Sequence, residues 1–97
     1  MKTFTVNKSA VVNEIASILN GFVERAGRPG VTEQVYSEGI AAIAALMDLQ
    51  FRLGAFGGKD PAATRDQRTR EWIVALKRSY VNSPAAPVVA DAIGGAA

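Results

Sequence analysis

The sequence predicts an all-α domain, a small bundle of three main helices with a short fourth helix near the C-terminus. Apolar residues recur at helical spacing in three long stretches, and Pro and Gly fall mostly between these stretches. Hydrophobic residues make up 48% of the 97 residues. A chain of this length forms one domain and can bury roughly 60 to 65% of its unfolded surface. Residues 1–97 are therefore expected to be a single helical domain.

Residues 1–8 are expected to form an extended N-terminal arm. Phe4 and Val6 alternate with polar residues and can share one face of an extended segment. Two interpretations stay open: Phe4 plugs the core, or the segment pairs as a strand across a homodimer. No apolar stretch follows the Met1–Lys2 start, so no signal peptide is expected and the predicted location is the cytoplasm.

The first helix is expected to begin near Ser9, because serine is a favourable N-cap. Gly27 is expected to take the left-handed conformation after the helix, where Pro29 cannot readily continue it. Gly21 and Gly39 interrupt helical stretches, and close helix crossing is the expected reason for both. Apolar residues form one face of this helix: Val11, Ile15, Ile18, Leu19 and Phe22.

The second helix, with Thr32 as N-cap and continuing to Leu53, is the predicted centre of the core. Its apolar residues cover roughly 200° of the circumference, whereas a surface helix has a stripe of roughly 100°. Such a helix needs neighbours on two sides. Asp48 and Arg52 have the spacing of a helical ion pair. The two apolar rows are Val35, Gly39, Ala42, Leu46, Leu49 and Leu53, and Tyr36, Ile40, Ile43, Met47 and Phe51.

The loop 54–60 is rich in glycine and contains Lys59, which invites comparison with a phosphate-binding P-loop. The sequence departs from the P-loop pattern at two positions that phosphate and magnesium binding require. Leu53 stands at the first glycine position, and Asp60 replaces the Ser or Thr that would bind magnesium. The loop is therefore predicted to be a connector, with Phe56 either packed into the core or exposed as a contact.

The third helix has Asp60 as N-cap and Pro61 at its first position, and it is expected to run to about Val81. Its second half is amphipathic, and Trp72 is assigned to the core. Its polar first half is expected to project beyond the core. Residues 82–97 form a tail rich in Pro, Ala and Gly, in which residues 87–93 are expected to form the short fourth helix.

The residue inventory argues against an enzyme. The chain has no His and no Cys, so the commonest general base, metal ligand and nucleophile are absent. Its carboxylates occur mostly singly, and Asp66 with Arg70 has the spacing of a second helical ion pair. We therefore expect no catalysis, no cofactor, no metal and no small-molecule substrate. The apolar run 40–47 is too short to cross a membrane.

A basic segment is the main sequence feature that indicates a binding partner. Residues 59–78 carry a net charge of +3, whereas the rest of the chain carries −1. The predicted partner-binding residues are Phe56, Lys59, Arg65, Arg68, Arg70, Lys77 and Arg78.

We interpret the chain as a non-enzymatic protein-protein interaction module that binds a protein partner, forms a homo-oligomer, or does both. It would act as a small accessory or structural subunit of a larger assembly, or as a protein inhibitor. Small phage-encoded proteins often have this character, and such a protein would lie in the host cytoplasm or the virion. The alternative is a nucleic-acid-binding protein that uses the basic helix 59–78. Protein binding is favoured, because the basic residues are scattered over several helix faces and are interrupted by Asp66 and Glu71.

Overall fold

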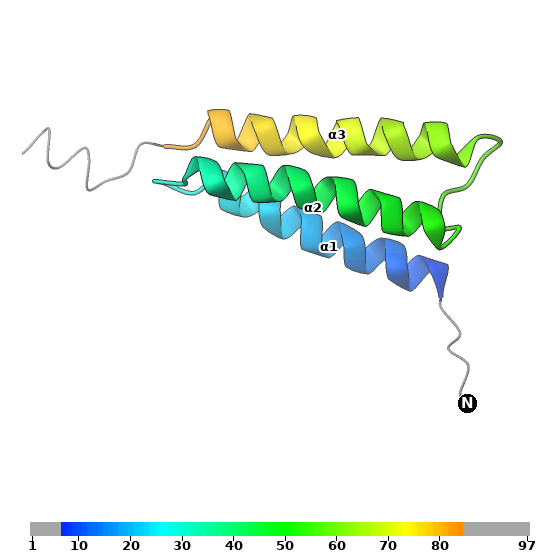
Figure 1. Cartoon of the computed structure of the whole chain (residues 1–97). Coiled ribbons are helices and arrows are strands. Elements are labelled where there is room, and N and C mark those ends of the chain that lie inside the picture. The colour runs from blue at the N-terminus through cyan, green and yellow to red at the C-terminus, as the bar shows by residue number, and fades with distance from the viewer. Residues whose placement is uncertain (1–6, 85–97) are drawn as a thin grey trace, which may run out of the picture.

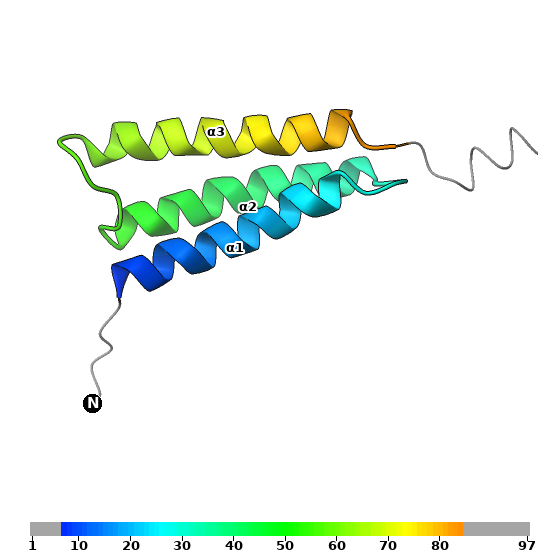
Figure 2. The same ribbon diagram turned by 180° about the vertical axis from the view of Figure 1, so that it is seen from behind.

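A computed structural model describes residues 7–84, which form three helices and no strand (Figure 1). They are α1 (Lys8–Ala26), α2 (Glu33–Arg52) and α3 (Pro61–Val81). Consecutive helices run in opposite directions, and each helix packs against both others (Figures 1 and 2). The predicted all-α fold with a central second helix is confirmed for this part of the chain. The expected fourth helix and the segment with Phe4 and Val6 lie outside the described residues.

The start of α1 differs from the prediction. Asn7, not Ser9, is the N-cap, and its Oδ1 accepts hydrogen bonds from the backbone N–H groups of Ser9 (2.9 Å) and Ala10 (3.3 Å). Asparagine is as good an N-cap as serine, so the helix can begin two residues earlier than expected. The left-handed residue after α1 is Gly30, with φ of 73°, while Gly27 stays right-handed with φ of −91°. The left-handed residue of the connection therefore lies three residues later than expected.

The boundaries of α2 and α3 follow the prediction closely. Thr32 precedes α2 as its N-cap, although its side chain makes no capping hydrogen bond. Asp60 caps α3 through Oδ1, which accepts a hydrogen bond from the Ala63 N–H at 3.1 Å, and Pro61 is the first helical residue. α3 ends at Val81, as expected. A side-chain capping hydrogen bond thus marks the start of α3, whereas α2 begins after Thr32 without one.

The core lies along the line where the three helices meet. Leu19, Ile43 and Leu76, one from each helix, are fully buried. Trp72 and Phe56 are partly buried and pack against this core, which confirms the assignment of Trp72 and decides between the two interpretations of Phe56. Other members of the core and its surroundings are Ile15, Ala26, Met47, Tyr36 and Tyr80, and the two tyrosine rings stack at 4.7 Å.

The two helical glycines have different roles. A Cβ atom added at Gly39 would lie 2.7 Å from Leu76 Cδ2, so Gly39 permits the close approach of α2 and α3. Gly21 has no heavy atom within 4 Å of such a Cβ position. The expectation of close packing is therefore confirmed for Gly39 and wrong for Gly21.

α1 and α3 cover the apolar arc of α2 along most of its length, and the arc is exposed to solvent near the C-terminal end of α2. Ile43 and Met47 are buried, but Leu49 and Leu53 remain 43% and 38% exposed. Gln50, which belonged to neither predicted row, is only 7% exposed. Two neighbouring helices therefore cover less than the full 200° arc, and they enclose one polar residue instead of two leucines.

The first half of α3 does not project beyond the bundle. The Arg65 guanidinium lies 4.6 Å from the centroid of the Phe51 ring, and its Nη1 is 3.9 Å from Asp48 Oδ1. These contacts hold the first turns of α3 against the last turns of α2. Residues 61–71 lie outside the hydrophobic core, as expected, but they still pack on α2, because a polar helix can also pack through arginine on an aromatic face.

Candidate functional site

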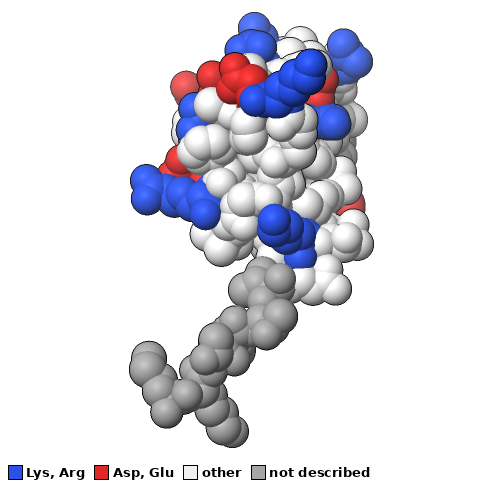
Figure 3. Space-filling view, turned by 90° about the vertical axis from the view of Figure 1, so that its right-hand side faces the viewer, with Lys and Arg blue, Asp and Glu red and all other residues white. Residues whose placement is uncertain are grey.

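The predicted partner-binding residues do not form a single surface. Five of them lie in the α2–α3 loop or the first half of α3, and Lys77 and Arg78 lie in its second half. Figure 3 views the bundle from its right-hand end in Figure 1 and shows basic and acidic side chains intermixed there. The contacts of each residue therefore decide which cations are available to a partner.

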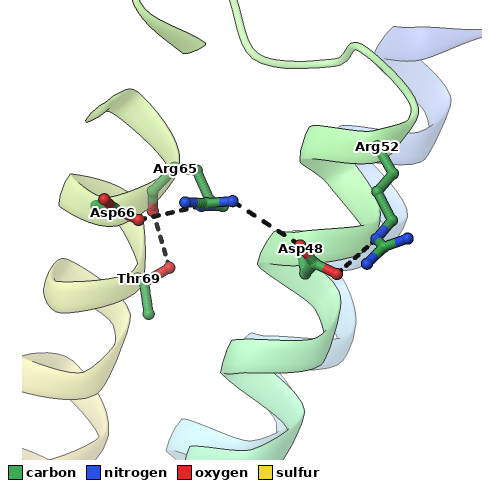
Figure 4. A network of polar contacts seen from close by, with 5 residues as sticks. All are labelled: Asp48, Arg52, Arg65, Asp66 and Thr69. Atoms are coloured by element: carbon green, nitrogen blue, oxygen red, sulfur yellow. Dashed lines mark hydrogen bonds and ion pairs between the residues drawn. The ribbon is translucent and has the colours of Figure 1, made fainter. Parts of the chain in front are cut away.

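Arg65 is engaged in contacts within the chain. Its Nε donates a hydrogen bond to Asp66 Oδ1 at 3.0 Å, and Asp48 lies between Arg65 and Arg52 (Figure 4). With the Phe51 ring beneath its guanidinium, the Arg65 side chain is only 29% exposed. We assign it to the packing of α3 on α2 and not to a partner surface.

The two predicted helical ion pairs have different outcomes. Asp48 and Arg52 pair at 2.7 Å, as expected. Asp66 pairs with its neighbour Arg65, and the expected bond to Arg70 is not formed. The reason is tertiary, because Arg65 is held over Phe51 and its guanidinium reaches Asp66 from there. As a result, Arg70 makes no ion pair within residues 7–84.

The other predicted residues at this end of the bundle also differ in availability. Arg68 Nη1 lies 3.3 Å from Glu71 Oε1, so its charge is partly neutralised. Phe56 is partly buried against the core, so only part of its ring is open to a partner. Lys59 is exposed and makes no ion pair among the described residues. Lys59 is thus the only predicted residue of the loop that stays open to solvent.

A different surface lies along the outer side of α3, toward its C-terminal end. We call it the α3 outer surface. Val74 is 52% exposed and Val81 is 67% exposed, and they are seven residues apart and therefore on one helix face. Lys77 and Arg78 lie between them and, with Arg70, make no ion pair within residues 7–84. The α3 outer surface consists of Arg70, Val74, Lys77, Arg78, Val81 and Asn82.

This surface follows from how α3 packs. Leu76 is fully buried, so residues on the opposite side of the helix face away from α1 and α2. Val74, Lys77, Arg78, Val81 and Asn82 line a shallow groove of about 280 Å³. Valine is a poorer helix former than alanine or lysine, so two exposed valines weaken the helix slightly and add nothing to the core. Neither valine was among the predicted residues, although the spacing of both places them on the helix face opposite Leu76.

Chemically, the α3 outer surface offers positive charge next to apolar side chains. The cations can attract and orient carboxylates, and the groove can accept an apolar side chain. In the part of the chain that the structure describes, His, Cys, Asp and Glu form no group of three that could hold a metal ion. Over the same residues, no helix is long and apolar enough to cross a membrane. Comparison of the chain with family models, curated proteins and solved structures finds no match.

Proposed function

We propose that this chain is a non-enzymatic protein-binding module that recognises an acidic protein surface through the α3 outer surface. It would serve as an accessory subunit of a larger assembly or as an inhibitor. One observation carries the proposal: Val74 and Val81 are exposed on one helix face, beside three cations that make no ion pair among residues 7–84.

The energetics of such a surface favour a protein partner. Single exposed apolar residues are ordinary, but two valines on one face with a groove between them offer a contact site. Fully burying a valine contributes about 1.5 to 3 kcal/mol. Complementary charges add mainly to the association rate and to specificity. A partner with one apolar anchor and flanking carboxylates would use both properties of the surface.

The test is affinity purification from the native host cell, or from the infected cell if the protein is phage-encoded, followed by calorimetry with the purified partner. We expect Val74→Asp and the double variant Lys77→Glu with Arg78→Glu to weaken binding at least tenfold. The matched controls are Leu49→Asp, which places the same charge on an exposed leucine of α2, and Arg52→Glu at the C-terminal end of α2, the end of the bundle opposite Val81. Equal binding by all four variants would contradict the proposal, and so would turnover of a substrate without a partner.

Self-association is the form of protein binding that exposed Leu49 and Leu53 favour. Leu49 lies in the last turn of α2 and Leu53 is its C-cap, so both lie outside the α3 outer surface. Light scattering on the purified protein at high concentration measures this directly. A dimer that Leu49→Asp dissociates would assign the interface to α2, whereas a monomer at all concentrations would exclude a homo-oligomer.

Nucleic-acid binding is the alternative, because Arg70, Lys77 and Arg78 can also contact phosphates. Two features disfavour nucleic-acid binding. The carboxylates of Asp66 and Glu71 lie on the same helix, and they form ion pairs with Arg65 and Arg68. A band-shift assay at low and moderate salt distinguishes the two functions. Phosphate-driven binding must be present at low salt and fall steeply as salt is raised.

A further inference from the structure

A cleft separate from the α3 outer surface lies among all three helices. Its volume is about 270 Å³, and α1, α2 and α3 each contribute to its lining. In Figures 1 and 2 the ribbons of α1 and α3 lie farthest apart at the end that holds the start of α1, and α2 also lies farther from α3 there than at the other end. The cleft occupies this more open half of the bundle, between Val12 and Ala16 of α1 and Trp72 of α3.

The walls of the cleft are mainly apolar. Val12, Ala16 and Met47 line it together with the indole of Trp72. An apolar cavity of about 150 Å³ can hold benzene. A volume of about 270 Å³ therefore admits a ring with a short side chain, or an alkyl chain of similar size, but not a drug-sized ligand.

Two polar side chains, Gln50 and Arg68, also line the cleft. Gln50 is only 7% exposed, and its one hydrogen bond, from Nε2 to the Ala55 carbonyl, is long at 3.5 Å. Arg68 uses Nη1 for Glu71, but its side chain is 60% exposed and a guanidinium has five N–H donors. Apolar walls with an amide and a guanidinium fit a ligand that combines an apolar body with an anionic acceptor.

We propose that this cleft binds a small apolar carboxylate of the size of octanoate or 3-phenylpropionate. The apolar part lies against Trp72 and Met47, and the carboxylate accepts hydrogen bonds from Arg68 and from the Gln50 amide. Arginine and carboxylate form two parallel hydrogen bonds, which gives the site its preference for this group. Binding replaces Glu71 as the partner of Arg68. The proposal does not depend on the protein-binding function of the α3 outer surface.

The experiment uses Trp72, the only tryptophan of the chain, as a reporter inside the cleft. The full-length protein is titrated with octanoate while Trp72 emission is recorded, and then with octanol, which has the same chain length and no charge. We expect a saturable change with octanoate and a dissociation constant of about a millimolar or lower. No saturable change with octanoate or 3-phenylpropionate would overturn the proposal.

Three variants give the proposal its sharpest test. Arg68→Gln should weaken octanoate binding about tenfold and leave octanol unaffected. Glu71→Gln should strengthen octanoate binding, because it removes the competing carboxylate. Ala16→Leu should fill the cleft and abolish binding. The melting temperature of this variant should not fall below that of the unmodified protein, and this measurement checks that the fold is retained. The control is Arg28→Gln, an arginine of similar exposure that also pairs with a glutamate. Equal octanoate affinity in Arg68→Gln, Arg28→Gln and the unmodified protein would overturn the assignment.

Discussion

The two halves of α3 differ in how their cations are paired: two of the three arginines in the first half make ion pairs, whereas neither cation of the second half does so among the described residues. In the first half, Arg65 lies over Phe51 and pairs with Asp48 and Asp66, and Arg68 pairs with Glu71. In the second half, Lys77 and Arg78 make no ion pair among the described residues and lie beside exposed valines. The difference shows that the sequence gives the position of a cation, whereas the packing of the helices decides whether that cation is paired within its own chain.

Inner and outer positions of the second half should differ most in stability. Leu76→Ala removes a fully buried side chain and should lower the free energy of unfolding by about 2 to 5 kcal/mol. Val74→Ala, two residues away on the outer surface, should change it by less than about 0.5 kcal/mol. Urea denaturation followed by circular dichroism measures both values. Similar losses in the two variants would mean that the outer surface is part of the folded core.

The glycine pair tests how closely the second half of α3 approaches α2. Gly39→Ala places a methyl group against buried Leu76, and the overpacking of about 1 to 3 kcal/mol exceeds the helix-propensity gain of up to about 1 kcal/mol. We expect Gly39→Ala to lower the free energy of unfolding by about 1 kcal/mol, which thermal unfolding measures. Gly21→Ala meets open space and should stabilise the protein by about 0.5 to 1 kcal/mol. Stabilisation by both changes would show that Leu76 moves aside freely.

The smallest expected effect concerns the charges themselves. Arg65→Met removes the contacts to Asp48, Asp66 and the Phe51 ring and should cost about 0.5 to 1 kcal/mol of folding stability. Lys77→Met removes no ion pair and should be close to neutral. The Arg65 effect should shrink in 1 M salt, about the concentration at which the screening length falls to 3 Å. If Lys77→Met proves as costly as Arg65→Met, the two halves of α3 do not differ in the way described.

Much of the fold could be predicted because its signals are local. Asp60 and Pro61 mark the start of α3 through chemistry within one turn, and α3 ends at Val81 as predicted. The start of α1 was missed by two residues, since Asn7 and Ser9 are comparable caps and the sequence does not rank them. The candidate site was predicted only in part. Lys77 and Arg78 were named, but Val74 and Val81 were not, because helical periodicity identifies the apolar residues of the buried face and gives no role to valines on the opposite face.

The sequence by itself determined that the chain folds into helices, where two of the three begin, and that α2 needs neighbours on two sides. These properties follow from helical periodicity and capping, which act within a few residues. Only the tertiary structure decided which cations are available, because Asp66 pairs with Arg65 and not with Arg70 once Arg65 is held over Phe51. It also decided that Gln50 is enclosed while Leu49 remains exposed. Such outcomes depend on which side chains of different helices come into contact. The spacing of residues along the sequence does not predict these contacts.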